Sequence, residues 1–239
     1  EYFLPSLTEM SRLFYNKMNY DSAFYYAYKA LSVDTYDPAA NFEYGRASLK
    51  RKRYNDAVDG FEVASLSVPF RSAAYTDISK IYLLKKEYCK AIEYAEKSLI
   101  NNKYNIESLQ LLGLLYGLTG NKNKANSLNE LIRIIDPLNH FIRFEDYWQN
   151  KTPSNLKSFQ STIKNEMPEQ IYLELGVWYY SLGLNERALG VFSLAPLNSE
   201  IKYWEAYLKK DVEELKKIEN LSSSFVFPFR EESQPVFEW

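Results

Sequence analysis

Four alanines recur at a constant interval of 34 residues along the chain. They are Ala23, Ala57, Ala91 and Ala125. Three tyrosines keep the same interval three positions earlier, at Tyr20, Tyr54 and Tyr88. A period of this length, sustained without an insertion, is typical of an array in which one supersecondary unit is stacked on its own copies. The period therefore predicts a repeat architecture rather than one globular core.

Other positions keep the same register and indicate what the repeated unit is. Twelve residues before each alanine lies a small residue, and an apolar residue precedes it. The small residues are Ser11, Gly45, Ser79 and Gly113, and the apolar ones are Met10, Tyr44, Ile78 and Leu112. Apolar and small residues recur at helical spacing in two blocks per repeat, such as residues 73–84 and 89–101. Because small residues let two helices approach closely, each repeat is predicted to be a helix pair.

These residues resemble the tetratricopeptide repeat (TPR). Its signature has a bulky residue, Leu, Gly and Tyr in the first helix, then Ala, Phe, Ala and a closing Pro. The second repeat carries Gly45, Ala57, Phe61, Ala64 and Pro69, and the fourth carries Leu112, Gly113, Tyr116, Ala125 and Pro137. The resemblance implies an all-α fold, a right-handed α-α superhelix or TPR solenoid, with four regular 34-residue units over residues 1–137.

The register breaks after residue 137, and we expect two or three degenerate helix pairs there. Residues 138–167 are predicted to form one degenerate pair, and residues 168–220 irregular TPR-like pairs. Residues 221–239 are predicted to be an extended tail or the start of a further unit of the same solenoid. Because the chain does not begin with Met and ends on apolar residues, we expect it to be part of a larger protein.

Four short strings resemble a narrower group, bacterial proteins in which TPR units follow an uncharacterised β-rich domain. The strings are DTYDPAAN at 34–41, FRSAAY at 70–75, DPLNHF at 136–141 and VFPFR at 226–230. This resemblance implies that any catalytic domain lies upstream of the helical region.

Composition excludes several classes of function. The chain has 29 Lys and Arg against 31 Asp and Glu, a net charge of -2, so no basic field is available to bind nucleic acid. A single Cys, Cys89, and a single His, His140, argue against disulfides, metal sites and most nucleophile–histidine pairs. We therefore expect no enzyme activity, no cofactor and no metal. No run of eighteen apolar residues occurs, so we expect no membrane insertion and favour a cytoplasmic location.

The TPR resemblance implies a concave groove lined by the first helix of each pair. Carried over by register, the groove positions are Thr8, Phe42, Thr76 and Gln110, then Arg12, Arg46 and Lys80, then Tyr15, Leu49 and Leu83. One interpretation is a basic stripe with aromatic flanks that binds an acidic peptide or a carboxyl terminus. The alternative is that the acidic residue three positions before each cation neutralises it on the helix surface.

The sequence thus predicts a non-enzymatic protein–protein interaction or assembly scaffold. Its partner would be a protein segment or another domain of the same polypeptide, and a homodimer through residues 225–239 is a further hypothesis. The alternative is a carbohydrate-associated module of a larger polysaccharide-processing protein, suggested by the 16% aromatic content, with exposed Trp148 or Trp178 binding sugars. An enzyme would instead require a pocket that combines His140 with Glu145 or Asp146.

Overall fold

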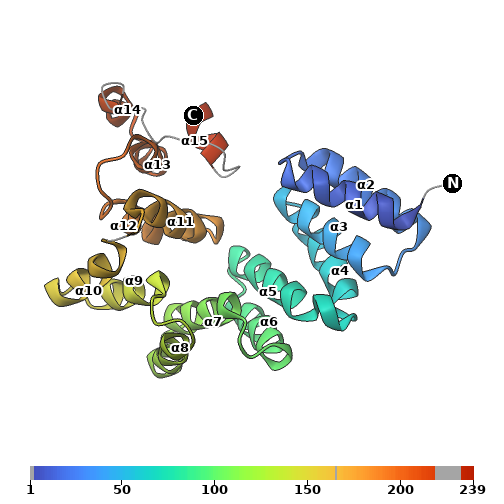
Figure 1. Ribbon diagram of the computed structural model, residues 1–239, viewed down its shortest axis with the longest axis horizontal. Coiled ribbons are helices and arrows are strands. Elements are labelled where there is room, and N and C mark those ends of the chain that lie inside the picture. The colour runs from blue at the N-terminus through green and yellow to red at the C-terminus, as the bar shows by residue number, and fades with distance from the viewer. Residues whose placement is uncertain (1–2, 165, 219–232) are drawn as a thin grey trace. The chain divides into compact units, whose positions relative to one another are not determined.

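The structure, a computed structural model, describes residues 3–164, 166–218 and 233–239, and it contains helices but no strand in these ranges (Figure 1). The predicted VFPFR segment lies outside the described residues. The chain forms two compact units, Glu1–Ile135 and Asp136–Trp239.

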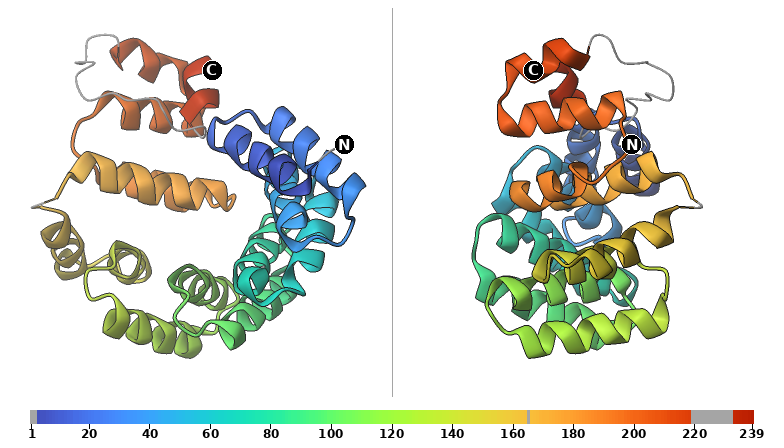
Figure 2. Two further views of the ribbon diagram at one scale, coloured as in Figure 1. Left: turned by 45° about the vertical axis from the view of Figure 1, so that its right-hand side comes forward. Right: turned by 90° about the vertical axis from the view of Figure 1, so that its left-hand side faces the viewer.

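The first unit consists of helix pairs joined by short turns, as the repeat predicts (Figure 2). The pairs are α1 (Leu4–Asn16) with α2 (Tyr20–Val33), α3 (Pro38–Lys50) with α4 (Tyr54–Ser65), α5 (Val68–Leu84) with α6 (Tyr88–Asn101), and α7 (Ile106–Leu118) with α8 (Lys122–Ile135). Each helix contacts the next along the chain. In addition, α1 contacts α3, α3 contacts α5, and α5 contacts α7. The first helices of the pairs therefore form one continuous row.

The turn inside each pair has the same backbone geometry in all four repeats. One residue adopts a left-handed conformation, with φ between 59° and 80°, at Met18, Lys52, Lys86 and Gly120. The next amide then donates to a carbonyl five residues earlier, as Glu87 N does to Tyr82 O at 2.8 Å. This is the Schellman arrangement that satisfies the last carbonyls of a helix. Because it recurs every 34 residues, the second helix of every pair leaves its turn in the same direction.

The small residue on each first helix sets how the paired helices pack. A Cβ on Gly45 would lie 2.8 Å from the ring of Phe61, which is fully buried sixteen residues later. Where this position is Ser11 or Ser79, the residue sixteen positions later is a buried alanine, and the serine hydroxyl donates to the carbonyl of Ala23 (2.8 Å) or Ala91 (2.6 Å). In the second repeat a large side chain on the second helix thus accompanies glycine on the first.

The second unit repeats this packing in a less regular array. Its helices are α9 (His140–Gln149), α10 (Pro153–Ile163), α11 (Pro168–Ser181), α12 (Asn185–Phe192), α13 (Ser199–Lys209), α14 (Val212–Ile218) and α15 (Gln234–Glu238). A Cβ on Gly176 would overlap the ring of Phe192, so α11 and α12 approach each other as α3 and α4 do. Helix α13 contacts α12, α14 and α15.

Substitution of Gly45 tests this packing. We expect Gly45→Ala to lower the free energy of unfolding by about 1–3 kcal/mol, because the new methyl group overpacks against the buried Phe61 ring. The matched control is Gly117→Ala, where no atom lies within 4 Å of the new Cβ. Alanine there should be neutral or stabilise the helix by up to about 1 kcal/mol. Urea denaturation followed by circular dichroism measures both, and equal stability of the two variants would contradict the packing described.

Candidate functional site

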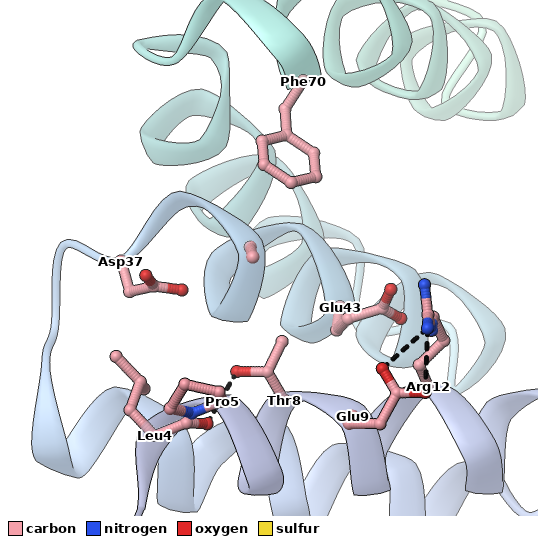
Figure 3. A pocket seen from close by; sticks show the side chains of 9 residues that line it. Leu4, Pro5, Thr8, Glu9, Arg12, Asp37, Glu43 and Phe70 are labelled. Atoms are coloured by element: carbon pink, nitrogen blue, oxygen red, sulfur yellow. Dashed lines mark hydrogen bonds and ion pairs between the residues drawn. The ribbon is translucent and has the colours of Figure 1, made fainter.

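A cavity of about 310 Å³ opens on the row of first helices in the first unit (Figure 3). Its lining comes from α1, from the start and middle of α3, and from the start of α5. The lining residues include Leu4, Thr8, Arg12, Asp37, Glu43 and Phe70. Two predicted groove residues, Thr8 and Arg12, are therefore brought together on one surface. The cavity combines apolar walls with charged groups, as ligand sites do.

Two further predicted groove residues, Tyr15 and Arg46, contact each other. The guanidinium of Arg46 lies 3.8 Å from the centroid of the Tyr15 ring, a cation–π contact between α3 and α1. Phe42 packs against the rings of Phe61 and Phe70, with centroids 5.5 Å and 5.2 Å away. Each of these three side chains is half-buried, so it supports the surface as well as forming part of it.

The remaining predicted groove residues differ in their depth. Leu83 and Thr76 are buried, at 3% and 2% exposure, and Leu49 packs against the core of the second and third repeats. Gln110 is half-buried on α7. Thr8 and Thr76 occupy equivalent positions in their repeats, but Thr8 is half-buried in the cavity lining and Thr76 is buried.

Each cation of the predicted basic stripe is paired with the acidic residue three positions earlier. The nitrogen–oxygen distances are 2.7 Å for Arg12–Glu9, 3.0 Å for Arg46–Glu43 and 2.9 Å for Lys80–Asp77. Lys80 also lies 2.6 Å from Glu107 on α7. Burial lowers the pKa of Lys80, but these two carboxylates outweigh it and keep the pKa above its ordinary value. The ion pairs that the alternative interpretation predicts are therefore present.

Glu43 is the most buried carboxylate of the cavity lining, with 7% of its surface exposed. Burial raises the pKa of Glu43, and its attraction to Arg46 offsets only part of that rise. A cation that enters the cavity would stabilise the ionised carboxylate.

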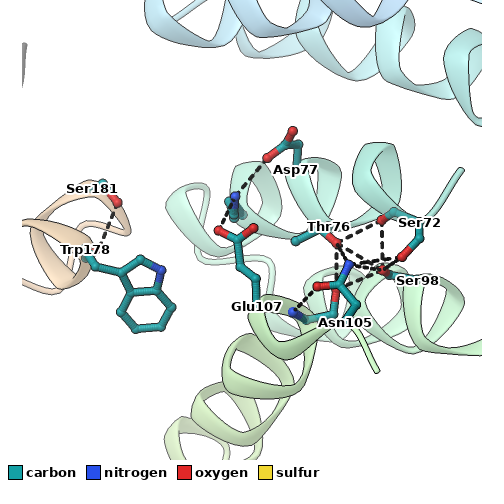
Figure 4. A network of polar contacts seen from close by, with 10 residues as sticks. Ser72, Thr76, Asp77, Ser98, Asn105, Glu107, Trp178 and Ser181 are labelled. Carbon is teal, nitrogen blue, oxygen red and sulfur yellow. Dashed lines mark hydrogen bonds and ion pairs between the residues drawn. The ribbon is translucent and has the colours of Figure 1, made fainter. Parts of the chain in front are cut away.

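A cluster of hydroxyl groups lies where α5, α6 and α7 meet, and sequence reasoning did not single it out (Figure 4). Thr76 Oγ1 lies 2.6 Å from Ser108 Oγ and 3.0 Å from Ser98 Oγ. Asn105 Nδ2 donates to Thr76 Oγ1 at 3.2 Å. The equivalent positions in the two preceding repeats are fully buried alanines, Ala30 with Ala40 and Ala64 with Ala74. The sequence signal for this cluster is a change at equivalent positions of successive repeats, from Ala30 and Ala64 to Ser98. All these hydroxyl groups are hydrogen-bonded to one another, so the cluster is a structural junction.

The residues proposed for an enzyme lie in the second unit, where Glu145 bonds to groups other than His140. The Tyr179 hydroxyl donates to Glu145 Oε1 at 2.6 Å, and Arg187 donates to the same oxygen. Glu145 and Tyr179 are buried, at 3% and 0% exposure. The carboxylate beside His140 is that of Glu166, with 3.2 Å between Nε2 and Oε2. Glu145 therefore belongs to a buried network that joins α9, α11 and α12.

The tryptophans of the second unit, including the two proposed to bind sugars, are packed to different degrees. Trp204 is fully buried. Trp148 and Trp178 are half-buried; the ring of Trp148 covers Gly190, and that of Trp178 packs on Phe141 with centroids 5.3 Å apart. Carbohydrate binding stays a prediction. In the described ranges, no group of His, Cys, Asp and Glu is placed to hold a metal ion, and no helix is long and apolar enough to cross a bilayer.

Removal of the Glu145 carboxylate should destabilise the second unit. Glu145→Ala leaves the buried Arg187 cation and the Tyr179 hydroxyl without their acceptor, which costs about 3–5 kcal/mol. The control is Glu213→Ala, which breaks the exposed Glu213–Lys216 pair and should cost about 0–1 kcal/mol. Urea denaturation measures the difference. A Glu145→Ala protein as stable as the control would contradict the network.

The same network predicts a loss of stability at alkaline pH. Burial and the neighbouring Glu145 raise the pKa of Tyr179 well above its ordinary value. In the unfolded chain the phenol ionises near its ordinary pKa of about 10, whereas in the folded chain it stays protonated. The contribution of protonated Tyr179 to the free energy of unfolding is therefore complete below a pH of about 10, and it is lost as the pH rises further. The urea midpoint should fall more steeply between pH 9 and pH 11 for the native chain than for Tyr179→Phe; equal slopes would count against the assignment.

Comparison with known proteins supports the fold. No family model and no curated protein matches the sequence. Among solved structures, a tetratricopeptide repeat protein from Parabacteroides merdae is 17% identical, with a TM-score of 0.59 over 98% of this chain and 98% of that chain. PilF of Pseudomonas aeruginosa is 13% identical, with a TM-score of 0.55 over 98% and 96%. YrrB, a TPR protein with an unusual peptide-binding site, is 15% identical, with a TM-score of 0.50 over 90% and 91%.

At these identities the likeness concerns the fold alone. It extends over nearly the whole chain, and it agrees with the helix pairs and the 34-residue period described above. The chain therefore has the tetratricopeptide repeat fold that its sequence predicts.

Proposed function

We propose that the chain is a non-enzymatic interaction scaffold that binds a protein segment on the first-helix surface of its first unit. The observation that carries this proposal is the cavity of about 310 Å³ that Thr8 and Arg12 line. It lies at positions that the repeat register assigns to the groove. A peptide-binding site in YrrB, which shares the fold, supports a peptide as the class of ligand.

The charges of the cavity favour a segment with a basic side chain. The lining carries three carboxylates, Glu9, Asp37 and Glu43, and one cation, Arg12. Leu4 and Phe70 add apolar walls, and an aromatic ring also attracts a cation. A lysine or arginine flanked by apolar residues would match this lining. The acidic peptide of the sequence-based interpretation would meet three carboxylates here and one cation, Arg12, which is paired with Glu9.

The mechanism of binding would be recognition by a preformed surface. Ion pairs and ring contacts hold Arg12, Arg46 and Tyr15 in place before any ligand arrives. Side chains that are already ordered lose little conformational entropy on association, so more of the contact energy remains as affinity. The partner would be a separate protein or another domain of the same polypeptide.

Blocking the cavity tests this function. Thr8→Trp places a large ring in the cavity, and Ser127→Trp places the same ring on the exposed surface of α8 as a matched control. Partners captured from native lysate are identified by mass spectrometry, and the binding of each is then measured with purified proteins. We expect a partner whose affinity falls at least tenfold with Thr8→Trp and is unchanged with Ser127→Trp. Partners bound equally well by both variants would contradict the assignment of the site.

A further inference from the structure

The second unit contains a cavity of about 580 Å³ that the proposed function does not use. One wall is a single face of α10, where Lys157, Gln160, Ser161 and Lys164 follow one another at intervals of three, one and three residues. The opposite wall comes from the start of α11 and from the segment after α12. Its residues include Pro168, Tyr172, Leu194 and Pro196.

The cavity lies at a junction that is closed in the first unit. There, the second helix of one pair meets the first helix of the next through fully buried small residues, Ala30 with Ala40 and Ala64 with Ala74. In the second unit, α10 packs against α9 and makes few contacts with α11. Long polar side chains on the exposed face of α10 explain the difference, because burying lysine and glutamine against a helix is unfavourable.

The lining of this cavity has one sign of charge. It carries two lysines and no carboxylate, together with the apolar side chains of Ile163, Tyr172 and Leu194. Among the described residues no carboxylate forms an ion pair with either lysine, and both lysines are exposed. The apolar surface extends beyond the cavity, because Met167 and Leu197, adjacent in sequence to lining residues, are 69% and 70% exposed. A matching ligand therefore combines negative charge with an apolar group.

We propose that this cavity binds an acidic peptide segment with one large apolar side chain. The apolar side chain would enter the space between Tyr172 and Leu194, and two carboxylates would pair with Lys157 and Lys164. Seven residues of helix separate the two lysines by about 10.5 Å along the axis. Side chains on one face of an extended chain lie two or four positions apart, and four residues span about 13 Å, a distance that flexible lysine side chains can match. The favoured motif thus has two acidic residues four positions apart with the apolar residue between them.

Two other classes of ligand fit the lining less well. Nucleic acid needs a broad basic field, whereas the cavity supplies two cations on a chain of net charge -2. A fatty acid offers one carboxylate to two separated ammonium groups. The peptide satisfies both cations and also fills the apolar part.

Selection from a library of displayed random seven-residue peptides tests the motif. The bait is the native chain, and the counter-selection uses the variant Lys157→Glu/Lys164→Glu, which keeps the surface of the first unit. We expect the selected peptides to share two acidic residues four positions apart with a large apolar residue between them. A library that yields no such motif, or peptides that the counter-selection variant binds equally well, would overturn the proposal.

The affinity of the selected consensus peptide is then measured by fluorescence anisotropy on variants checked by circular dichroism. We expect Lys164→Glu and the cavity-filling Ser161→Trp each to weaken binding at least tenfold. Lys122→Glu makes the same charge change on α8 and should alter the affinity less than twofold. Thr8→Trp, which blocks the cavity of the first unit, should also leave the affinity for the consensus peptide unchanged. A result against the second cavity can therefore be distinguished from a result against the first. Decanoate that competes with the peptide at equal molar affinity would overturn the assignment to a peptide.

Discussion

The contact between a small residue on the first helix of a pair and the side chain sixteen positions later on the second helix determines how each pair packs. At Gly45 and Gly176 the absence of a Cβ leaves room for the rings of Phe61 and Phe192. At Ser11 the hydroxyl instead bonds to a carbonyl of the second helix. Both solutions keep two helices close together, and the recurring left-handed turn keeps their direction constant. The row of first helices in the first unit depends on this uniform pairing.

The first candidate site depends on that uniformity, and the second follows from a departure from it. In the first unit the pairs stack regularly, and the cavity forms where Phe70 and the carboxylates of Glu9 and Glu43 face one another across the row. In the second unit Lys157 on α10 and Lys164 at its C-terminal end line the junction with α11, and this junction stays open. The first lining has an excess of negative charge and the second is positive. The two surfaces therefore suit ligands of opposite charge.

The sequence predicted the repeat, the helix pairs and the ion pairs of the groove, because all three depend on spacing along the chain. One helix boundary differs from the prediction. The sequence places Pro69 at the end of the second repeat, whereas Pro69 lies in the first turn of α5. Proline is tolerated there because the first amides of a helix have no acceptor within the helix. The burial of individual side chains was not predictable either, because Thr8 and Thr76 occupy equivalent positions in their repeats and yet differ in burial. The Glu145–Tyr179–Arg187 network joins residues of three helices beyond the regular register, and spacing alone carries no signal for it.

A double-mutant cycle between Gly45 and Phe61 tests whether these two positions determine how the helices of the pair pack. Gly45→Ser, Phe61→Ala and the double variant are compared with the native chain by urea denaturation, because the double variant reproduces the serine–alanine combination of the first and third repeats. We expect the double variant to be more stable than the sum of the single effects implies, by about 1–3 kcal/mol. Additive effects, within about 0.5 kcal/mol, would show that the two positions do not determine the packing of the pair.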